Sequence, residues 1–310
     1  MKKILFAFLS LLLTISIIYT IYYFISKDNN INKDDNNITI KEDELTTIGY
    51  TKEEAKEIRK LFTKEEIDTY LLKTKYDDLL SYKKCKAFNI ENLNRYIAYK
   101  EKNNYSIENI VNYVEINLDK EFYTDIKEID SSSINKLTLV NKYNKLIDNY
   151  EASDLITLDK NYSSNKQKVK SEIFPYLKNM FDDAKKEGLS LKVISGYRTH
   201  SLQNTLFNNS KKRNGLDHAL MYSARPGHSE HQLGYAVDIN TVQEKFKNTK
   251  EYAFLKDNAY KYGFIERYKE GKEFITGYGY EPWHYRYVGI DAAKIIYEND
   301  LTLEEYLLLY

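Results

Sequence analysis

The feature that most restricts the fold of this 310-residue chain is the segment 226–238, in which His231 precedes Asp238 by seven positions. Within it, residues 234–239 alternate glycine, alanine and aspartate with larger apolar residues, and this period of two predicts a β-strand. Asp238 then shares one strand face with two very small residues. The sequence therefore predicts a carboxylate with free space beside it for a bound ion or a substrate.

A second histidine pattern, Glu281-Pro-Trp-His284, completes a candidate metal site. Two imidazoles and one carboxylate, from His231, His284 and Asp238, make a three-ligand zinc site whose fourth position is open to water, as in catalytic zinc centres. Glu281 is the additional carboxylate that such a site needs as a proton acceptor. Residues three apart in a straight strand face opposite sides. We therefore expect the strand to begin at Pro282, with Glu281 in the preceding turn.

An arginine lies where a predicted strand, residues 189–195, gives way to a helix. Arg198 at such a turn points off the end of a sheet, where its planar guanidinium can bind a carboxylate in a bidentate manner. The position of Arg198 after a strand, taken alone, fits a surface or ion-pair arginine as well as it fits a substrate-binding one. We interpret the other three histidines, His200, His218 and His228, as partly exposed side chains without a role in metal binding.

The overall composition excludes some classes of function. The chain is 42% hydrophobic and 30% charged with a formal net charge of +0, which is sufficient for an ordinary globular core. Balanced charge argues against nucleic acid as the main partner, because nucleic-acid-binding proteins normally carry a basic surface. The single cysteine, Cys85, cannot form an intramolecular disulfide and lies far from the histidine patterns, which argues against cysteine-based zinc or nucleophile chemistry.

The N-terminal segment 1–26 predicts a single-pass membrane anchor. Two lysines precede an uncharged apolar run long enough to span a bilayer. The residues at its end are bulky, which disfavours a cleaved signal peptide, although cleavage is the alternative interpretation. The lysines keep the N-terminus cytoplasmic, so we expect a cell-membrane protein whose remaining chain is extracytoplasmic. Residues 27–46 are polar and aperiodic, and predict a flexible linker.

Helical patterns follow the linker. Thr51 and Thr63 each begin a capping box, and residues 47–110 predict a small helical module, for which partner or cell-wall binding is an alternative to a purely structural role. Residues 111–135 are interpreted as a connecting segment, and 136–310 as the domain that carries the site. Within that domain, the sequence predicts a short strand at 136–142 and an amphipathic helix at 175–186.

Several motifs between residue 136 and the end of the chain match one family pattern. They are Ser195-Gly-Tyr-Arg-Thr, Gln203, Ser223-Ala-Arg-Pro-Gly, Ser229-Glu-His-Gln-Leu-Gly-Tyr-Ala-Val-Asp, Gly263-Phe-Ile-Glu-Arg-Tyr, Thr276-Gly-Tyr and Glu281-Pro-Trp-His-Tyr-Arg-Tyr-Val-Gly. Together they resemble the VanY-like D-alanyl-D-alanine carboxypeptidases, zinc peptidases related to lysostaphin-type enzymes and to the hedgehog signalling domain. Tyr235 departs mildly from the family pattern, in which a smaller aliphatic residue is common.

The resemblance implies an α+β fold in which a small antiparallel sheet, flanked by helices, carries the zinc site. It also implies roles for seven residues: His231, Asp238 and His284 as zinc ligands, Glu281 as the catalytic base, Arg198 as the residue that holds and polarises the substrate, and Gln203 and Ser229 as lining of the site. The tyrosine at position 235 affects the expected packing and not the metal ligands.

The activity implied by the resemblance is zinc-dependent D,D-carboxypeptidase activity, which removes the terminal D-alanine from peptidoglycan stem peptides. An L,D-carboxypeptidase acting on tetrapeptide stems is the nearest alternative, because the same groups can serve either scissile bond. An endopeptidase of peptide cross-bridges is a weaker alternative. A membrane-tethered zinc protein without catalysis is a further one, and the presence of Glu281 beside the three ligands argues against it.

Overall fold

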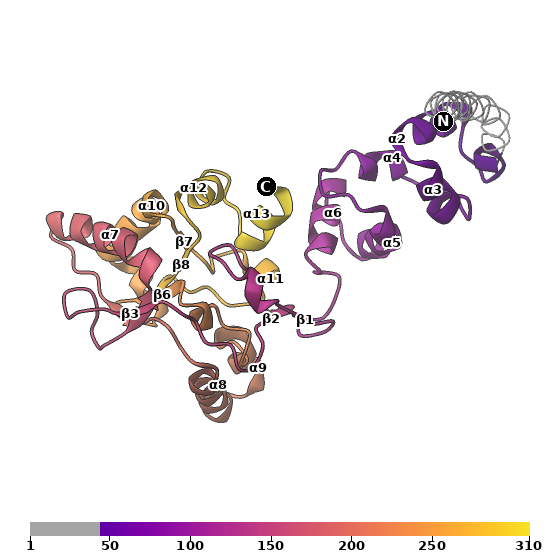
Figure 1. Cartoon of the computed structure of the whole chain (residues 1–310). Helices are drawn as coiled ribbons and strands as arrows, with labels where there is room; N and C mark the ends of the chain where they lie inside the picture. Colours follow the sequence, from indigo (N-terminus) through magenta and orange to yellow (C-terminus); the bar gives the residue numbers. More distant parts are fainter. Residues whose placement is uncertain (1–43) are drawn as a thin grey trace, which may run out of the picture. The chain divides into compact units, whose positions relative to one another are not determined.

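The computed structural model of the chain describes residues 44–310, and Figure 1 shows the order of their helices and strands. The chain divides into two compact units between Leu93 and Asn94, and each unit is described here by itself. This division falls inside the segment 47–110 that the sequence analysis treats as one helical module. The domain limits drawn from the sequence stay a prediction.

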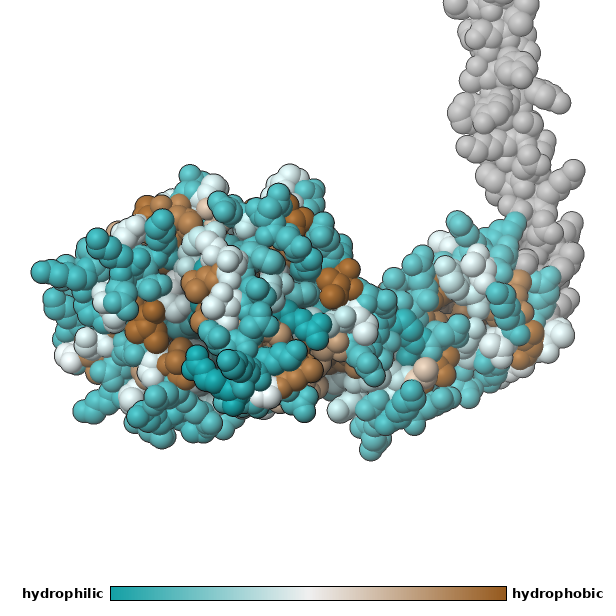
Figure 2. All heavy atoms as spheres, turned by 90° about the horizontal axis from the view of Figure 1, so that it is seen from below, coloured by the Kyte–Doolittle hydropathy of each residue, from teal (hydrophilic) through white to brown (hydrophobic). Residues whose placement is uncertain are grey.

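The predicted membrane anchor and most of the predicted linker lie outside the described residues. None of the helices that residues 44–310 form is long and apolar enough to cross a bilayer. On the face shown in Figure 2, hydrophilic side chains predominate, and the hydrophobic ones form small separate patches. The large apolar side chains of the described residues are mostly buried in the cores of the two units.

The first unit is a set of short helices. Thr51 and Thr63 begin helices with complete capping boxes, in which each threonine hydroxyl accepts from the N–H of the glutamate three residues later. Both predicted capping boxes are therefore confirmed. The elements are α2 (Lys52–Leu61), α3 (Lys64–Glu66), the π-helical turn η1 (Ile67–Leu71), α4 (Leu79–Lys83) and the 3-10 turn η2 (Ile90–Asn92). Leu45, Ala55, Ile58, Leu71 and Leu79 form its buried centre.

The second unit contains the sheets and the remaining helices. Its helices are α5 (Leu93–Lys102), α6 (Ile107–Glu115), α7 (Phe174–Lys186), α8 (His200–Asn214), α9 (Leu216–Tyr222), α10 (Lys250–Asn258), α11 (Glu273–Thr276), α12 (Ile290–Glu298) and α13 (Leu303–Leu309). Its strands are β1 (Lys127–Glu128), β2 (Asn144–Lys145), β3 (Leu155–Thr157), β4 (Lys168–Lys170), β5 (Val193–Ser195), β6 (Ala236–Ile239), β7 (Phe264–Glu266) and β8 (His284–Tyr287). The 3-10 turns are η3 (Ser131–Ser133), η4 (Ser171–Ile173), η5 (Glu230–Leu233), η6 (Glu244–Asn248) and η7 (Ala259–Tyr262).

The main sheet has four antiparallel strands in the order β5-β6-β8-β7, so its two central strands are β6 and β8. In their register, Asp238 lies opposite His284 and Ala236 lies opposite Arg286. Two smaller two-stranded sheets, β1-β2 and β3-β4, accompany it. This mixed architecture of helices around a small sheet agrees with the α+β class that the sequence predicts.

The two faces of the central strands have different chemistry. Residues directly opposite each other in an antiparallel pair share one face. The polar face carries Asp238, His284 and Arg286, whereas the other face is apolar and packs into the core. Core residues from these strands are Val237, Ile239, Tyr285 and Tyr287, and those from α7 are Leu177, Met180, Phe181 and Ala184. Tyr235 is also buried in this core, so the larger side chain at this position is accommodated.

The local predictions for this unit have mixed outcomes. The helix predicted at 175–186 is confirmed, because α7 begins one residue earlier and carries Pro175 in its first turn. The strand predicted at 136–142 is wrong: this segment consists of turns and irregular backbone. The side chain of Asn141 accepts hydrogen bonds from the backbone N–H groups of Tyr143 and Asn144, and such local bonding competes with a strand.

The partly buried carboxyl group of Glu266 on β7 makes the stability of the second unit depend on pH. Burial raises its pKa to about 7. The folded state therefore binds a proton that the unfolded state releases, and stability falls as the pH rises from about 4.5 towards 7 and above. Its Oε1 accepts from the hydroxyl of Tyr252 at 3.0 Å, a contact that a glutamine amide can retain.

Between pH 5 and pH 8 we expect the free energy of unfolding to fall less in the Glu266→Gln protein than in the wild type. The difference between the two losses should be up to about 3 kcal/mol. The measurement is urea unfolding followed by the fluorescence of Trp283, which is the single tryptophan of the chain and lies in this core. The same pH dependence in both proteins would contradict the raised pKa.

Candidate metal centre

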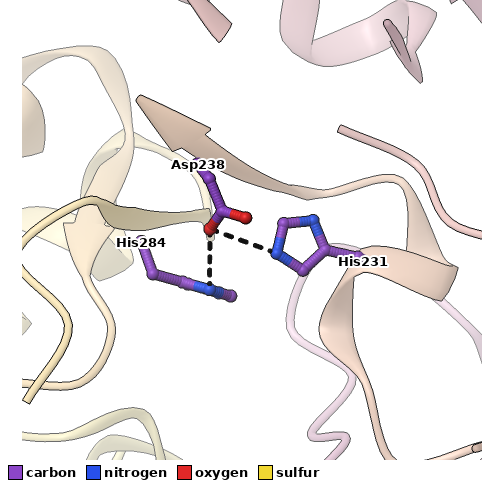
Figure 3. Close-up of side chains that lie close together, drawn as sticks. All are labelled: His231, Asp238 and His284. Carbon is purple, nitrogen blue, oxygen red and sulfur yellow. Dashed lines mark ion pairs between the residues drawn. The ribbon is translucent and has the colours of Figure 1, made fainter. Parts of the chain in front are cut away.

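Three side chains from separate elements meet on the polar face of the sheet (Figure 3). His231 lies in η5, Asp238 lies in β6, and His284 is the first residue of β8. The distance from Asp238 Oδ1 is 3.3 Å to His231 Nε2 and 3.4 Å to His284 Nδ1. One donor atom from each residue lies within 4.8 Å of the others, and all three residues are buried. The structure thus brings together the three predicted ligands.

The turn before β6 explains how His231 reaches Asp238. Gly234 ends η5 in the left-handed region with φ 80°, a conformation that side chains rarely adopt. A Cβ atom there would also lie 3.1 Å from a methyl carbon of Leu155. The glycine lets the chain reverse directly from the 3-10 turn into the strand, so that residues seven apart in sequence face each other.

The donor atoms fit a divalent metal ion. His231 Nε2 and Asp238 Oδ1 are buried and make no hydrogen bond within the described residues, although buried polar atoms are nearly always paired. His231 Nδ1 lies 2.8 Å from the carbonyl oxygen of Gly196, which can only accept, so Nδ1 carries the proton and Nε2 offers a lone pair. Two donors about 2.0 Å from a tetrahedral zinc ion lie about 3.3 Å apart, which matches the distances from Asp238 Oδ1 to the two imidazole nitrogens.

Glu281 also reaches the site, but by a different local structure from the one expected. The strand does not begin at Pro282; it begins at His284, and residues 281–284 form a turn closed by a 3.1 Å bond from the His284 N–H to the Glu281 carbonyl. The turn brings both side chains to one side, with Glu281 Oε2 3.5 Å from His284 Nδ1. Burial raises the pKa of Glu281.

Arg198 is held against the site by three side chains. Its Nε donates to Ser195 Oγ at 2.9 Å, its NH1 donates to Gln203 Oε1 at 3.4 Å, and its NH2 donates to Asp238 Oδ2. The two oxygens of Asp238 are therefore divided between the imidazoles and the guanidinium. Gln203 is in turn fixed by donation to the carbonyl of Ala224 at 2.8 Å. The contact with Asp238 is a role of Arg198 that the sequence analysis did not predict.

A cavity of about 520 Å³ opens over these residues. Volumes of this size are typical of sites for small molecules and peptide ends. All seven predicted site residues line it, including Ser229, and the cavity continues along α8 and α9 to Arg213, His218 and Tyr222. The predicted site residues therefore share one accessible space.

Comparison with known proteins identifies the group to which the chain belongs. The pattern of the family described as "VanY: D-alanyl-D-alanine carboxypeptidase" matches residues 166–290. The "Putative carboxypeptidase YodJ" of Bacillus subtilis is 45% identical over 207 residues, which cover 62% of this chain and 76% of that protein. A D-alanyl-D-alanine carboxypeptidase of Enterococcus faecalis is 41% identical over 180 residues, which cover 55% of this chain and 65% of that protein. The chain belongs to the VanY family. The predicted family is confirmed.

Solved structures of VanY-type proteins agree with this assignment. The LdcB LD-carboxypeptidase, solved to explain peptidoglycan recognition, has a TM-score of 0.55 and 45% identity, covering 59% of this chain and 90% of that one. The vancomycin-resistance D,D-dipeptidase VanXYg, solved with a D-Ala-D-Ala phosphinate analogue, has a TM-score of 0.51 and 36% identity. The match covers 56% of this chain and 70% of that one. The prediction of a carboxypeptidase-type enzyme is thus confirmed, with relatives named for both D,D and L,D specificity.

The remaining histidines lie apart from the three ligands. His200 and His218 are partly exposed or exposed, as predicted. His228 is buried, contrary to the prediction, and its Nδ1 lies 2.8 Å from the carbonyl of Asn141. Its ring also makes an edge contact with Tyr123. This histidine is a packed structural residue of the VanY-type domain.

Sequence reasoning overlooked Glu230. Its side chain is buried and lies between two arginines and His284. The signal was present, because this acidic residue stands inside the Ser229–Asp238 motif next to a predicted ligand. Charged side chains are almost never fully buried unless they are paired, so a buried glutamate at this point requires specific partners.

The assignment of the ligands can be tested with the two neighbouring buried histidines. We expect His231→Ala to weaken zinc binding by at least about 100-fold, more than the loss typical of residues that only support a ligand. His228→Ala is the matched control and should retain the metal, because that ring contacts no ligand. The measurement is zinc affinity by competition with a chromophoric chelator. Equal affinities in both variants would contradict the ligand assignment.

Proposed function

We propose that this VanY-family protein is a zinc-dependent carboxypeptidase that removes the terminal D-alanine from peptidoglycan stem peptides. The observation that carries the proposal is the convergence of His231, Asp238 and His284 with a second carboxylate, that of Glu281, in one cavity. Three ligands with an open position, beside a free general base, are the parts of a hydrolytic zinc site. The family relatives named as D-alanyl-D-alanine carboxypeptidases support the substrate class.

The environments of the two carboxylates separate their roles. Burial acts to raise the pKa of Asp238, but the charges of His231 and Arg198 outweigh it and hold the pKa well below the usual value. Burial raises the pKa of Glu281, which no arginine contacts within hydrogen-bonding distance among the described residues. A carboxylate held ionised suits a metal ligand, whereas one with a raised pKa suits proton transfer near neutral pH.

The proposed mechanism uses these groups in sequence. When bound, the zinc ion supplies Lewis-acid polarisation of the scissile carbonyl and of the attacking water. Glu281 accepts the proton of that water on its carboxylate and then delivers it to the departing amine of D-alanine. Arg198 uses three of its five N–H donors in fixed contacts, and the remaining ones are available to stabilise the developing oxyanion or a substrate carboxylate.

Replacing Glu281 separates catalysis from metal binding. We expect Glu281→Gln to lower kcat by about 100-fold or more, because general base catalysis typically contributes 10²–10⁴. Zinc affinity should stay close to that of the wild type. The assay is mass-spectrometric detection of D-alanine released from a pentapeptide stem. Glu266→Gln, on the opposite sheet face, is the control and should retain turnover. A wild-type rate in the Glu281→Gln protein would contradict the role of Glu281 as general base.

L,D-carboxypeptidase activity is the second candidate, and a specific observation favours it. The LdcB LD-carboxypeptidase shares 45% identity with this chain at a TM-score of 0.55, and 90% of its length is covered. We expect faster release of D-alanine from pentapeptide stems than from tetrapeptide stems. The reverse preference would favour the second candidate, and no product from either stem by the zinc-loaded protein would favour a binding protein without catalysis.

We also propose that residues 1–26 anchor the protein in the cell membrane, with residues 44–310 on the extracytoplasmic side. The uncharged apolar run after two lysines supports this proposal. Deletion of residues 1–26 should release the protein from the membrane fraction, and protease added outside intact protoplasts should digest the wild-type chain. Recovery of the full chain in the soluble fraction, or protection from external protease, would contradict the arrangement.

A further inference from the structure

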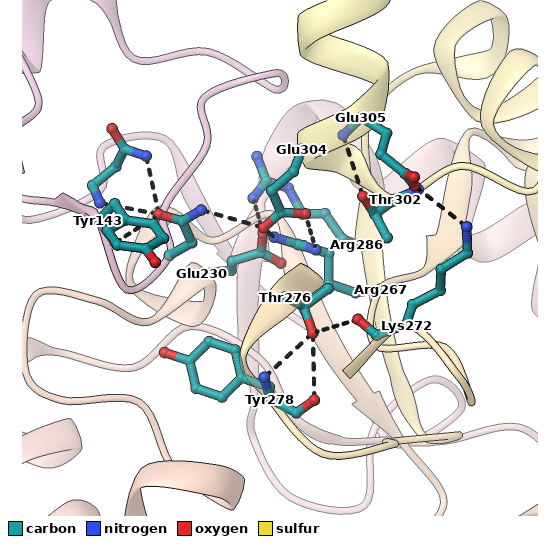
Figure 4. Close-up of polar contacts among 12 residues, drawn as sticks. Tyr143, Glu230, Arg267, Lys272, Thr276, Tyr278, Arg286, Thr302, Glu304 and Glu305 are labelled. Carbon is teal, nitrogen blue, oxygen red and sulfur yellow. Dashed lines mark hydrogen bonds and ion pairs between the residues drawn. The ribbon is translucent and has the colours of Figure 1, made fainter. Parts of the chain in front are cut away.

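We infer that Glu230 is a positioning residue for His284: its carboxylate, fixed by two buried arginines and by the C-terminal helix, orients the imidazole so that Nδ1 faces the metal. The inference rests on the proposed zinc site. It extends that site to Glu230 and its partners, which are not among the three predicted ligands. Figure 4 shows these side chains gathered from η5, β8, the segment after β7, and α13.

The contact between Glu230 and His284 joins two atoms that otherwise have no partner. Glu230 Oε2 lies 3.5 Å from His284 Nε2. Both atoms are buried, and neither makes a hydrogen bond within the described residues. A small movement of either side chain closes this distance to that of a hydrogen bond. Metal-ligating histidines almost always donate their second ring N–H to a carboxylate, a carbonyl or a water.

This contact selects the tautomer that metal binding needs. His284 Nδ1 faces Asp238 Oδ1 at 3.4 Å, on the side of the ligands. A nitrogen that binds a metal cannot carry a proton, so the proton belongs on Nε2, where an ionised carboxylate can only accept it. His231 has the opposite arrangement, with Nε2 towards the site and Nδ1 against the Gly196 carbonyl. Each of the two histidines thus has an acceptor behind its ring, at 2.8 Å for His231 and 3.5 Å for His284.

Two arginines hold Glu230 in place. Its Oε1 lies 2.7 Å from Arg267 Nε and 3.0 Å from Arg286 NH1, and all three side chains are buried. Burying an unpaired carboxylate costs several kcal/mol, so these cations are required for Glu230 to remain ionised beside the imidazole. Arg286 also donates at 2.9 Å to the carbonyls of Lys136 and Thr138, which fixes it from the far side.

The C-terminal helix α13 completes the network. Glu304 on this helix forms a bidentate pair with Arg267, with NH1 to Oε2 at 2.9 Å and NH2 to Oε1 at 2.8 Å. Bidentate pairing restricts both the position and the plane of the guanidinium. The two glutamates and two arginines have charges that sum to zero. A residue 20 positions beyond His284 in the sequence thereby restricts the geometry of that ligand.

The alternative explanation is that the network only stabilises the fold. The two explanations differ in what they predict for folded protein. A purely structural role lowers the stability of the metal-free protein and leaves the zinc affinity of the folded fraction unchanged. A positioning role lowers that affinity. The decisive variant is therefore one that keeps the charge beside the arginines and withdraws the carboxylate from His284.

Glu230→Asp meets this requirement, because it is shorter by one methylene and keeps its charge. The full-length protein is stripped with a chelator, its folded fraction is measured by Trp283 fluorescence, and zinc affinity is measured by competition. We expect 10–100-fold weaker zinc binding and an altered visible spectrum of the cobalt-substituted protein. Glu305→Gln is the matched control, because Glu305 lies on the same helix but caps Thr302 and pairs with Lys272; its zinc affinity should stay within about two-fold.

Glu304→Gln keeps the test decisive if Glu230→Asp does not fold. It leaves Glu230 intact but gives the network a net positive charge and loosens Arg267, so zinc binding should again weaken relative to Glu305→Gln. Unchanged zinc affinity in the folded Glu230→Asp protein overturns the inference. If that variant is unfolded, unchanged affinity in Glu304→Gln overturns it. A wild-type protein that binds no zinc contradicts the proposed function instead, so the two failures are distinguishable.

Discussion

The antiparallel pairing of β6 with β8 places Asp238 opposite His284, and the rest of the site depends on this register. A shift by one residue would move every side chain of a strand to the other face of the sheet. The apolar face prevents such a shift, because Val237 and Tyr285 lie opposite each other within the core. The hydrophobic packing on one side of the sheet thus fixes the metal-ligand geometry on the other.

The polar face carries several buried charges, and each has a compensating partner. Arg198 lies against Asp238, while Arg267 and Arg286 lie against Glu230. Buried ions are tolerated only when such pairing offsets their desolvation. His231 Nε2 and Asp238 Oδ1 make no hydrogen bond within the described residues and lie 3.3 Å apart at the predicted metal site. The arginines are therefore paired with carboxylates, whereas these two predicted ligand atoms have no hydrogen-bond partner, which is the arrangement that a cation-binding site requires.

The parts of the fold and the site that could be predicted from the sequence lie within short motifs. The strand around Asp238 follows from a period of two, and α7 follows from apolar helical spacing after a proline. Longer-range features could not be predicted in this way. The partners of Glu230 are separated from it by tens of residues, and one of them, Arg267, is in turn held by Glu304 on the last helix. The failed strand at 136–142 has a local cause, since the side chain of Asn141 offers the backbone an alternative set of hydrogen bonds.

The two glutamates beside His284 show how position decides the role of a carboxylate. Glu281 lies near Nδ1, on the same side of the ring as Asp238, whereas Glu230 lies near Nε2, on the opposite side. Burial acts to raise the pKa of Glu230, but Arg267 and Arg286 outweigh it and hold the pKa well below the usual value, so this group is a poor proton acceptor. The pKa of Glu281 is raised by burial. Because a general base must reach the attacking water, only the carboxylate on the metal side of the ring can serve. The carboxylate behind the ring can only orient it.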